Sequence, residues 1–133
     1  MLIDQTAKWS AIIWTPAQSF GPIDFTLFLN RGIIFSLAVP RIVYLPIALA
    51  VFAVFLFALF SAVKYNRPTV WGLALIVFGA VSNLADRLIH GATIDYLVFF
   101  NRSAVNLADG MILLGVLMFI WSHKKVSDIP SAS

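Results

Sequence analysis

Three long apolar stretches, each bounded by charged residues, dominate the pattern of the sequence. The clearest covers residues 42–63, which carry no charge and lie between Arg41 and Lys64. A helix rises about 1.5 Å per residue and needs about 20 apolar residues to cross a bilayer, so this stretch is long enough. The pattern predicts two further membrane helices, at about residues 70–88 and 105–122.

The N-terminal segment, residues 1–14, is amphipathic but too short and too charged to cross a bilayer alone. It does not resemble a signal peptide, because Asp4 precedes any apolar core and no cleavage site follows. We interpret it as the end of a first transmembrane helix that is short or truncated. The expected fold is an all-α membrane protein with four transmembrane helices in a single domain, residues 1–133.

Two shorter segments have the pattern of β-strands. Residues 23–30 are apolar at every second position, which is typical of a half-buried strand. Residues 94–100 follow Gly91 and are rich in β-branched and aromatic side chains. Neither segment is long enough for a spanning helix, so both predict a small β-rich region at the membrane surface.

Composition agrees with a membrane protein. The chain is 61% hydrophobic and 11% charged, against roughly 45–50% and about 25% in soluble domains. Its net charge is +3, but Lys and Arg are scattered or flank the apolar stretches, so we expect no nucleic-acid partner. The chain has no cysteine, which excludes disulfides, thiolate metal sites and a cysteine nucleophile.

Positive charges predict the orientation in the membrane. Lys64 and Arg67 in one short loop, and Lys124 and Lys125 near the C-terminus, favour the cytoplasmic side. With four helices both termini are then cytoplasmic and residues 91–102 lie outside. This arrangement gathers four polar residues at the outer face: Asn30, Asp86, Asp95 and Asp109.

All six carboxylates are aspartates, and four lie in or beside apolar segments: Asp4, Asp86, Asp95 and Asp109. Such an aspartate costs roughly 2.5–3.5 kcal/mol on insertion scales near the membrane centre, so it usually faces a partner or a cavity. Asn83, Asp86 and Arg87 share one helix face. Asp86 and Arg87 could therefore form a structural ion pair or take part in catalysis, and Asp4 and Lys8 could form a helix-stabilising pair.

Asp95 and Asp109 are the candidate catalytic pair. Asp109 lies three residues after Asn106 at the start of the last helix, where a carboxylate can also cap free N–H groups. Two neighbouring carboxylates share a proton, so one can polarise a water while the other protonates the leaving amine. This is amide hydrolysis without a metal. The spacing alone leaves open a proton or cation pathway and a purely structural polar cluster.

Other catalytic sets are missing from the sequence. It contains no HExxH motif, and His90 and His123 are its only histidines, which argues against a zinc protease. No glycine-rich phosphate loop occurs. We therefore expect neither a metal nor a cofactor.

Five blocks of the sequence resemble the signature motifs of the signal peptidase II family, in the family's order. They are Asp4-Gln-Thr-Ala-Lys8, Asn30-Arg-Gly-Ile-Ile-Phe35, Gly79-Ala-Val-Ser-Asn-Leu-Ala-Asp-Arg87, Gly91-Ala-Thr-Ile-Asp-Tyr96 and Val105-Asn-Leu-Ala-Asp109. The resemblance implies four helices with an extracytoplasmic β-cradle. It also implies removal of signal peptides from prolipoproteins, by cleavage before a cysteine that carries diacylglycerol.

The same resemblance implies roles for individual residues. Asp95 and Asp109 match the two catalytic aspartates. Other motif residues match supporting or substrate-binding positions: Asn30, Gly32, Asn83, Asp86, Arg87, Asn106, Asp4 and Lys8. Two features depart from the family pattern. Only three residues precede Asp4, and Ile33 and Ile34 replace small residues, where their bulk could narrow the substrate groove.

The resulting expectation is a monomeric aspartic endopeptidase of the bacterial inner membrane, with lipidated prolipoproteins and membrane lipids as its partners. Two alternatives stay open. One is a non-catalytic family member that binds lipoproteins or lipids, and the other is a small proton- or cation-conducting membrane protein.

Overall fold

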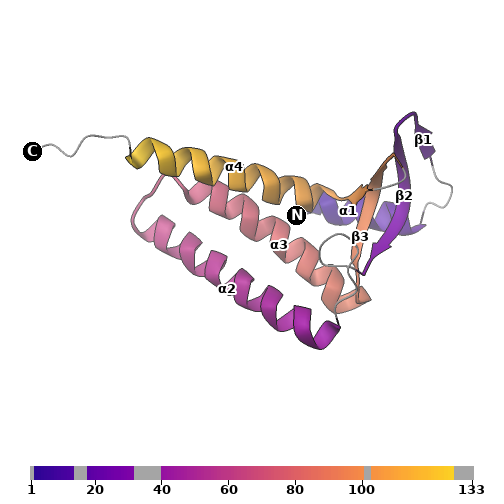
Figure 1. Cartoon of the computed structure of the whole chain (residues 1–133), viewed down its shortest axis with the longest axis horizontal. Coiled ribbons are helices and arrows are strands. Elements are labelled where there is room, and N and C mark those ends of the chain that lie inside the picture. The colour runs from indigo at the N-terminus through magenta and orange to yellow at the C-terminus, as the bar shows by residue number, and fades with distance from the viewer. Residues whose placement is uncertain (1, 14–17, 32–39, 101–102, 128–133) are drawn as a thin grey trace, which may run out of the picture.

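The computed structural model describes residues 2–13, 18–31, 40–100 and 103–127. Its elements, in chain order, are α1 (Leu2–Ile13), β1 (Gln18–Phe20), β2 (Ile23–Asn30), α2 (Arg41–Lys64), α3 (Val70–His90), β3 (Thr93–Phe99), β4 (Ser103–Val105) and α4 (Leu107–Ser127). The three long helices run lengthwise, the sheet lies at one end of them, and α1 lies beside that end (Figure 1).

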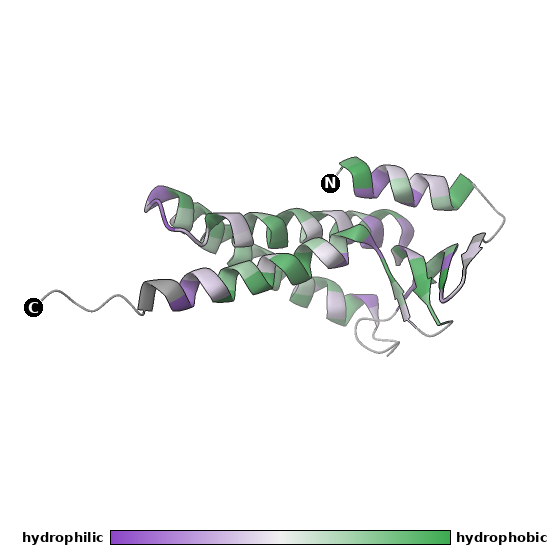
Figure 2. Cartoon of the chain, turned by 90° about the horizontal axis from the view of Figure 1, so that it is seen from above, coloured by the Kyte–Doolittle hydropathy of each residue, from purple (hydrophilic) through white to green (hydrophobic). Residues whose placement is uncertain are grey.

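Three helices of the described chain are long and apolar enough to cross a membrane: α2, α3 and residues Leu107–Lys124 of α4. These are the three spans that the hydrophobic pattern predicts, and Figure 2 shows apolar residues along most of their lengths. The helix α1 has 12 residues, so it extends about 18 Å against about 30 Å of hydrocarbon. The structure therefore confirms three candidate spans, and the fourth stays a prediction.

Glycines let α3 and α4 pack closely. A Cβ atom on Gly72 would lie 2.8 Å from the carbonyl oxygen of Gly115, and one on Gly115 would lie 2.6 Å from that of Gly72. Nearer the sheet, a Cβ on Gly79 would lie 2.6 Å from the carbonyl oxygen of Ala108. Small residues at such crossings allow membrane helices to approach backbone to backbone. The first turn of α4 is thereby held against the middle of α3.

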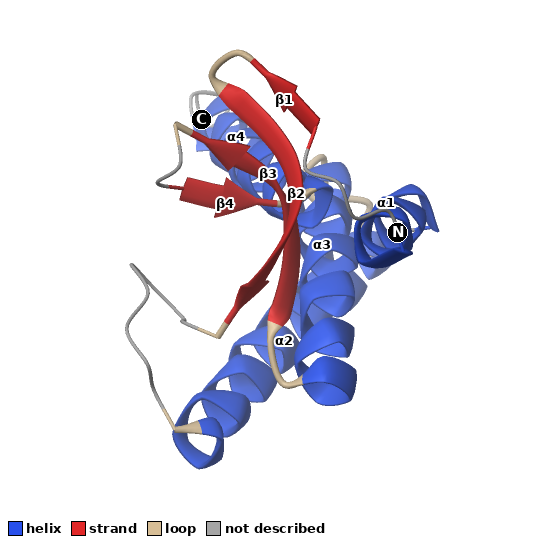
Figure 3. Ribbon diagram, turned by 90° about the vertical axis from the view of Figure 1, so that its right-hand side faces the viewer, coloured by secondary structure: helices blue, strands red, loops and turns tan. Residues whose placement is uncertain are grey.

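The sheet is four-stranded and antiparallel, in the order β1-β2-β3-β4, and the chain between β2 and β3 contains α2 and α3. The strands predicted at residues 23–30 and 94–100 are confirmed as β2 and β3. The short strands β1 and β4 have three residues each, too few for an alternating pattern to show in the sequence. Because residues Ser103–Val105 form β4, α4 begins at Leu107 rather than at the predicted residue 105. Figure 3 shows the sheet lying across the ends of the helices.

A left-handed glycine connects α3 to the sheet. Gly91 has a φ of 71° and follows the last residue of α3. Glycine adopts this conformation at a helix end without the steric cost that a Cβ would bring. The chain can therefore reverse directly into β3, which brings Asp95 back beside the end of α3.

Candidate functional site

Asp95 lies near the middle of β3, with only 1% of its surface exposed. One carboxylate oxygen accepts a 3.0 Å hydrogen bond from the side-chain amide of Asn30, on the neighbouring strand β2. The other oxygen accepts a 2.8 Å hydrogen bond from the side-chain amide of Asn106. Both oxygens are thus held by amide donors in a site largely closed to water.

Asp109 lies in the first turn of α4 and is partly exposed. Its backbone N–H donates to the side-chain oxygen of Asn106 at 2.9 Å, and the backbone N–H of Asn106 donates back to its carboxylate at 3.2 Å. This reciprocal pair is a capping box, so the capping role considered for Asp109 is confirmed. Its other carboxylate oxygen accepts a 2.8 Å hydrogen bond from Asn83 of α3.

Asn106 joins the two aspartates. Its side-chain amide donates to Asp95, to the side-chain oxygen of Asn83 at 3.1 Å and to the backbone oxygen of Ile94 at 3.3 Å. Since Asn83 in turn holds Asp109, one carboxamide network connects both carboxylates. Asp109 therefore does more than cap α4, because Asn106, its partner in the capping box, also donates a hydrogen bond to Asp95.

The pKa of Asp95 is raised from 3.8 to about 6. Burial is the largest cause, because it disfavours the charged form, and the negative charge of Asp109 adds to it. The hydrogen bonds from Asn30 and Asn106 lower the pKa and offset part of the rise. A pair of this kind can hold one proton near neutral pH and present both an acid and a base to a bound water.

A buried ion cluster lies behind the pair. The ammonium of Lys8 lies 2.7 Å from the carboxylate of Asp86 and 2.8 Å from that of Asp4. All three side chains are almost fully buried. The expected pair of Asp4 and Lys8 is therefore present, and it gains a second carboxylate from α3.

The partner expected for Asp86, Arg87, is replaced by Lys8. Consecutive helix residues point in different directions, so Asp86 faces α1 while Arg87 faces α2 and β3. The guanidinium of Arg87 donates a 2.8 Å hydrogen bond to the hydroxyl of Thr93 and lies 5.2 Å from the ring centroid of Tyr44. The spacing of Asp86 and Arg87 thus argues against a pair between them, but it does not identify Lys8 as the partner.

The ion cluster is bonded to the site on both sides. Lys8 donates to the side-chain oxygen of Asn83 at 3.3 Å, and the backbone N–H of Ile94 donates to Asp86 at 3.2 Å. Asp4 accepts hydrogen bonds from the backbone N–H of Ala108 at 3.3 Å and from the Tyr96 hydroxyl at 3.2 Å. The cluster therefore connects α1 to the residues adjoining both aspartates.

Three contributors were not singled out from the sequence for this role. Ser82 donates a 2.6 Å hydrogen bond to Asp4, Gln5 donates to Ser82 at 2.9 Å, and the Tyr96 hydroxyl accepts from the backbone N–H of Leu107 at 3.0 Å. Their position in the sequence could have indicated this role, because each is next to an acidic or amide residue of the motif blocks. Gly32, Ile33 and Ile34 lie outside the described residues.

A groove between α2 and α3 adjoins the network. Its volume is about 280 Å³, and Asn83 and Arg87 contribute its polar lining. The remaining lining is apolar and includes Phe52, Phe55 and Ile112. In the part of the chain that the structure describes, no three His, Cys, Asp or Glu side chains are arranged to hold a metal ion.

Known proteins resemble this chain along nearly its whole length. The family model described as "Signal peptidase (SPase) II" matches residues 1–124. A lipoprotein signal peptidase of Azoarcus sp. (strain BH72) is 35% identical over 112 residues, a match that covers 77% of this chain and 63% of that protein. One from Halothermothrix orenii is 32% identical over 137 residues, covering 96% of this chain and 94% of that protein.

Two solved structures, each described as that of a bacterial membrane enzyme, share the fold. The first has a TM-score of 0.79 at 19% identity and covers 99% of this chain and 87% of its own. The second has a TM-score of 0.72 at 20% identity and covers 92% of this chain and 85% of its own.

Proposed function

Because the chain belongs to the signal peptidase II family, we propose that it removes the signal peptides of diacylglyceryl-modified prolipoproteins, cleaving before the lipidated cysteine. The chain spans 63% of the Azoarcus protein and 94% of the Halothermothrix protein that it resembles, and both are lipoprotein signal peptidases. The observation that carries the proposal is the pair of Asp95 and Asp109, each held by carboxamides and connected through Asn106.

In the proposed reaction the pair acts as an aspartic endopeptidase. Asp95, whose pKa is raised, carries the shared proton, and Asp109 accepts a proton from a water molecule. The water oxygen attacks the scissile carbonyl carbon while Asp95 protonates the carbonyl oxygen. The tetrahedral intermediate then collapses: the C–N bond breaks, Asp109 returns its proton to the leaving nitrogen, and Asp95 regains a proton from a hydroxyl of the intermediate.

Asn30, Asn83 and Asn106 act as positioning residues in this scheme. Each donates to a carboxylate of the pair, so together they fix the orientation of the reacting oxygens. The groove beside Asn83 and Arg87 suits the apolar part of a membrane-embedded substrate, because its wall is apolar and its polar residues belong to the site.

The proposed setting is the bacterial inner membrane, with both termini cytoplasmic, α1 as part of a fourth membrane element and the protein acting as a monomer. Lys64 and Arg67 lie at the helix ends opposite the site, as does Lys124. Trp71 and Trp121, 73% and 71% exposed, lie near the same ends. Lysine and arginine favour the cytoplasmic side, and exposed tryptophans are typical of a membrane interface on either side. Together they favour a cytoplasmic interface at these helix ends, which leaves the aspartates at the outer face.

The clustering of carboxylates argues against a conducting protein. A transport path would distribute acidic groups through the depth of the membrane. The described carboxylates lie instead at the sheet end of the helices, with Asp4, Asp86, Asp95 and Asp109 in one bonded region and Asp24 in β2.

The decisive experiment incubates the purified protein with a diacylglyceryl-modified prolipoprotein and, separately, with its unlipidated form. We expect a shortened product that begins at the lipidated cysteine, from the modified substrate only. A folded protein that binds the modified substrate but leaves it uncut would support the non-catalytic alternative. A folded protein that neither binds nor cuts it would refute the proposed function.

A further inference from the structure

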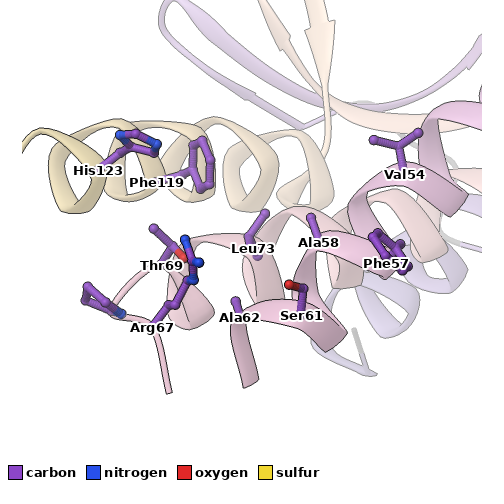
Figure 4. A pocket seen from close by; sticks show the side chains of 11 residues that line it. Val54, Phe57, Ala58, Ser61, Ala62, Arg67, Thr69, Leu73, Phe119 and His123 are labelled. Atoms are coloured by element: carbon purple, nitrogen blue, oxygen red, sulfur yellow. The ribbon is translucent and has the colours of Figure 1, made fainter. Parts of the chain in front are cut away.

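A second cavity lies at the end of the helices away from the aspartates. It has a volume of about 540 Å³ and is lined by the second half of α2, the turn between α2 and α3, the start of α3 and the last turns of α4. Figure 4 shows Arg67 and Thr69 on one side of it, facing Phe119 and His123 of α4 on the other. No residue of the aspartate network lines it.

The lining divides into an apolar wall and a basic rim. Val54, Phe57 and Leu73 belong to membrane-spanning segments, and Phe119 packs against His123 with ring centroids 6.0 Å apart. Arg67 and His123 are the basic residues among the described lining residues, and none of the described lining residues is a carboxylate. The described carboxylates lie at the opposite end of the molecule, and Asp128 lies outside the described residues.

The rim is placed by an ordered turn. The backbone N–H of Arg67 donates to the oxygen of Ala62 at 2.9 Å, and the N–H of Val70 donates to the oxygen of Arg67 at 3.3 Å. The guanidinium of Arg67 and the ammonium of Lys64 lie 6.0 and 5.3 Å from the ring centroid of Tyr65. Positive charge is therefore concentrated where the apolar wall ends.

We propose that this cavity binds one anionic phospholipid of the surrounding leaflet, with an acyl chain against α2 and α3 and the headgroup phosphate at Arg67 and His123. An acyl chain matches a wall that faces the hydrocarbon, and a phosphate matches a basic rim. A free phosphate would leave the apolar wall uncovered. A zwitterionic lipid would bring its ammonium into a rim that is already positive.

This lipid differs in place and role from the proposed substrate. The substrate's lipid has to reach Asp95 and Asp109, whereas this cavity is at the other end of α3. A lipid bound here bridges α2 to α3 and α4, because all three contribute lining residues. It therefore stabilises the helix bundle without entering the reaction.

The test measures lipid binding to the purified protein in a nonionic detergent. Phosphatidylglycerol and phosphatidylcholine with identical acyl chains are titrated separately, and the unfolding temperature is followed. We expect a saturable rise in unfolding temperature with phosphatidylglycerol and a much smaller one with phosphatidylcholine.

Arg67→Gln should weaken the apparent affinity for phosphatidylglycerol about fivefold, the effect of removing roughly one basic contact. Ala58→Leu, which adds bulk to the lining, should abolish the rise while leaving every charge in place.

Lys64→Gln is the matched control, because it removes a charge from the same end of α2 but from outside the cavity. Its affinity should stay within about twofold of that of the unaltered protein. An equal loss of affinity for phosphatidylglycerol in Lys64→Gln and Arg67→Gln would overturn the proposal, because it would indicate a general attraction of the lipid to the positive surface. So would equal binding of the two lipids, or an equal temperature rise with glycerol phosphate alone. Circular dichroism in the same detergent checks that each variant is folded, independently of any cleavage of prolipoprotein.

Discussion

Lys8 and Asp86 form a 2.7 Å ion pair between α1 and the end of α3, and both side chains are almost fully buried. A second carboxylate, that of Asp4, lies 2.8 Å from the same ammonium. Breaking a buried pair by removing one partner is strongly destabilising, because the remaining charge has neither water nor a counter-charge. The cluster therefore stabilises the position of α1 relative to the site.

Replacing Lys8 by methionine tests this role. Lys8→Met keeps an unbranched side chain one atom shorter but leaves Asp4 and Asp86 without their shared cation, so we expect a loss of about 3–5 kcal/mol in the free energy of unfolding. Chemical unfolding in detergent measures it. Lys64→Met, at the exposed end of α2, should change stability by about 0.5 kcal/mol or less. A Lys8→Met protein as stable as the unaltered one would show that the cluster contributes nothing net.

Asp95→Asn and Asp109→Asn should each abolish cleavage of the lipidated substrate. Asparagine keeps the shape of the side chain but cannot hold or exchange the shared proton. The double variant should be little worse than either single one, because residues that act as a unit are not additive. Asp24→Asn in β2 is the control and should keep full activity. Cleavage at the unaltered rate by either single variant would exclude the aspartic mechanism.

Activity should follow a bell-shaped pH profile. The pair works with one proton, so the rate falls on the alkaline side as pH rises above about 6, the raised pKa of Asp95. On the acidic side it falls once both carboxylates are protonated. Values of kcat/KM across pH 4–9, from cleavage rates at substrate concentrations well below KM, measure both limbs for the free enzyme. A rate that stays constant from pH 5 to 9 would contradict a shared proton.

Stability should change with pH in a direction set by the same shift. The folded pKa of Asp95, about 6, exceeds the ordinary value of 3.8, so folding favours its protonated form. This contribution is fully present below about 3.8 and is lost as pH rises to about 6. We therefore expect Asp95→Asn to gain stability relative to the unaltered protein over this interval, as measured by unfolding temperatures.

Glycine substitutions test the close packing of α3 and α4. Gly115→Ala would place its Cβ 2.6 Å from the backbone oxygen of Gly72, so the helices must separate. We expect a loss of about 1–3 kcal/mol, the usual cost of overpacking. Gly110→Ala, in the same helix, meets nothing within 4 Å and should be neutral or stabilising by about 0.5–1 kcal/mol. Equal effects at the two positions would refute the packing argument.

Much of the fold follows from local sequence properties. Hydropathy over some twenty residues predicts α2, α3 and α4, because a membrane helix satisfies its own backbone hydrogen bonds and only its length and polarity have to match the bilayer. An alternation of period two predicts β2 in the same way. The motif blocks also contain both aspartates, so the candidate site residues could be named without a structure.

Partner choice is not local, and tertiary structure decided it. Whether Asp86 pairs with Arg87 or with Lys8 depends on which face of α3 meets α1. Lys8 lies 78 positions before Asp86 in the sequence, so no local pattern can predict their contact. Asn106 likewise acquires its contact with Asp95 only because Gly91 turns β3 back beside α4. Hydropathy along the sequence determines where a membrane helix forms, but the rotation of one helix against another depends on packing of the whole chain.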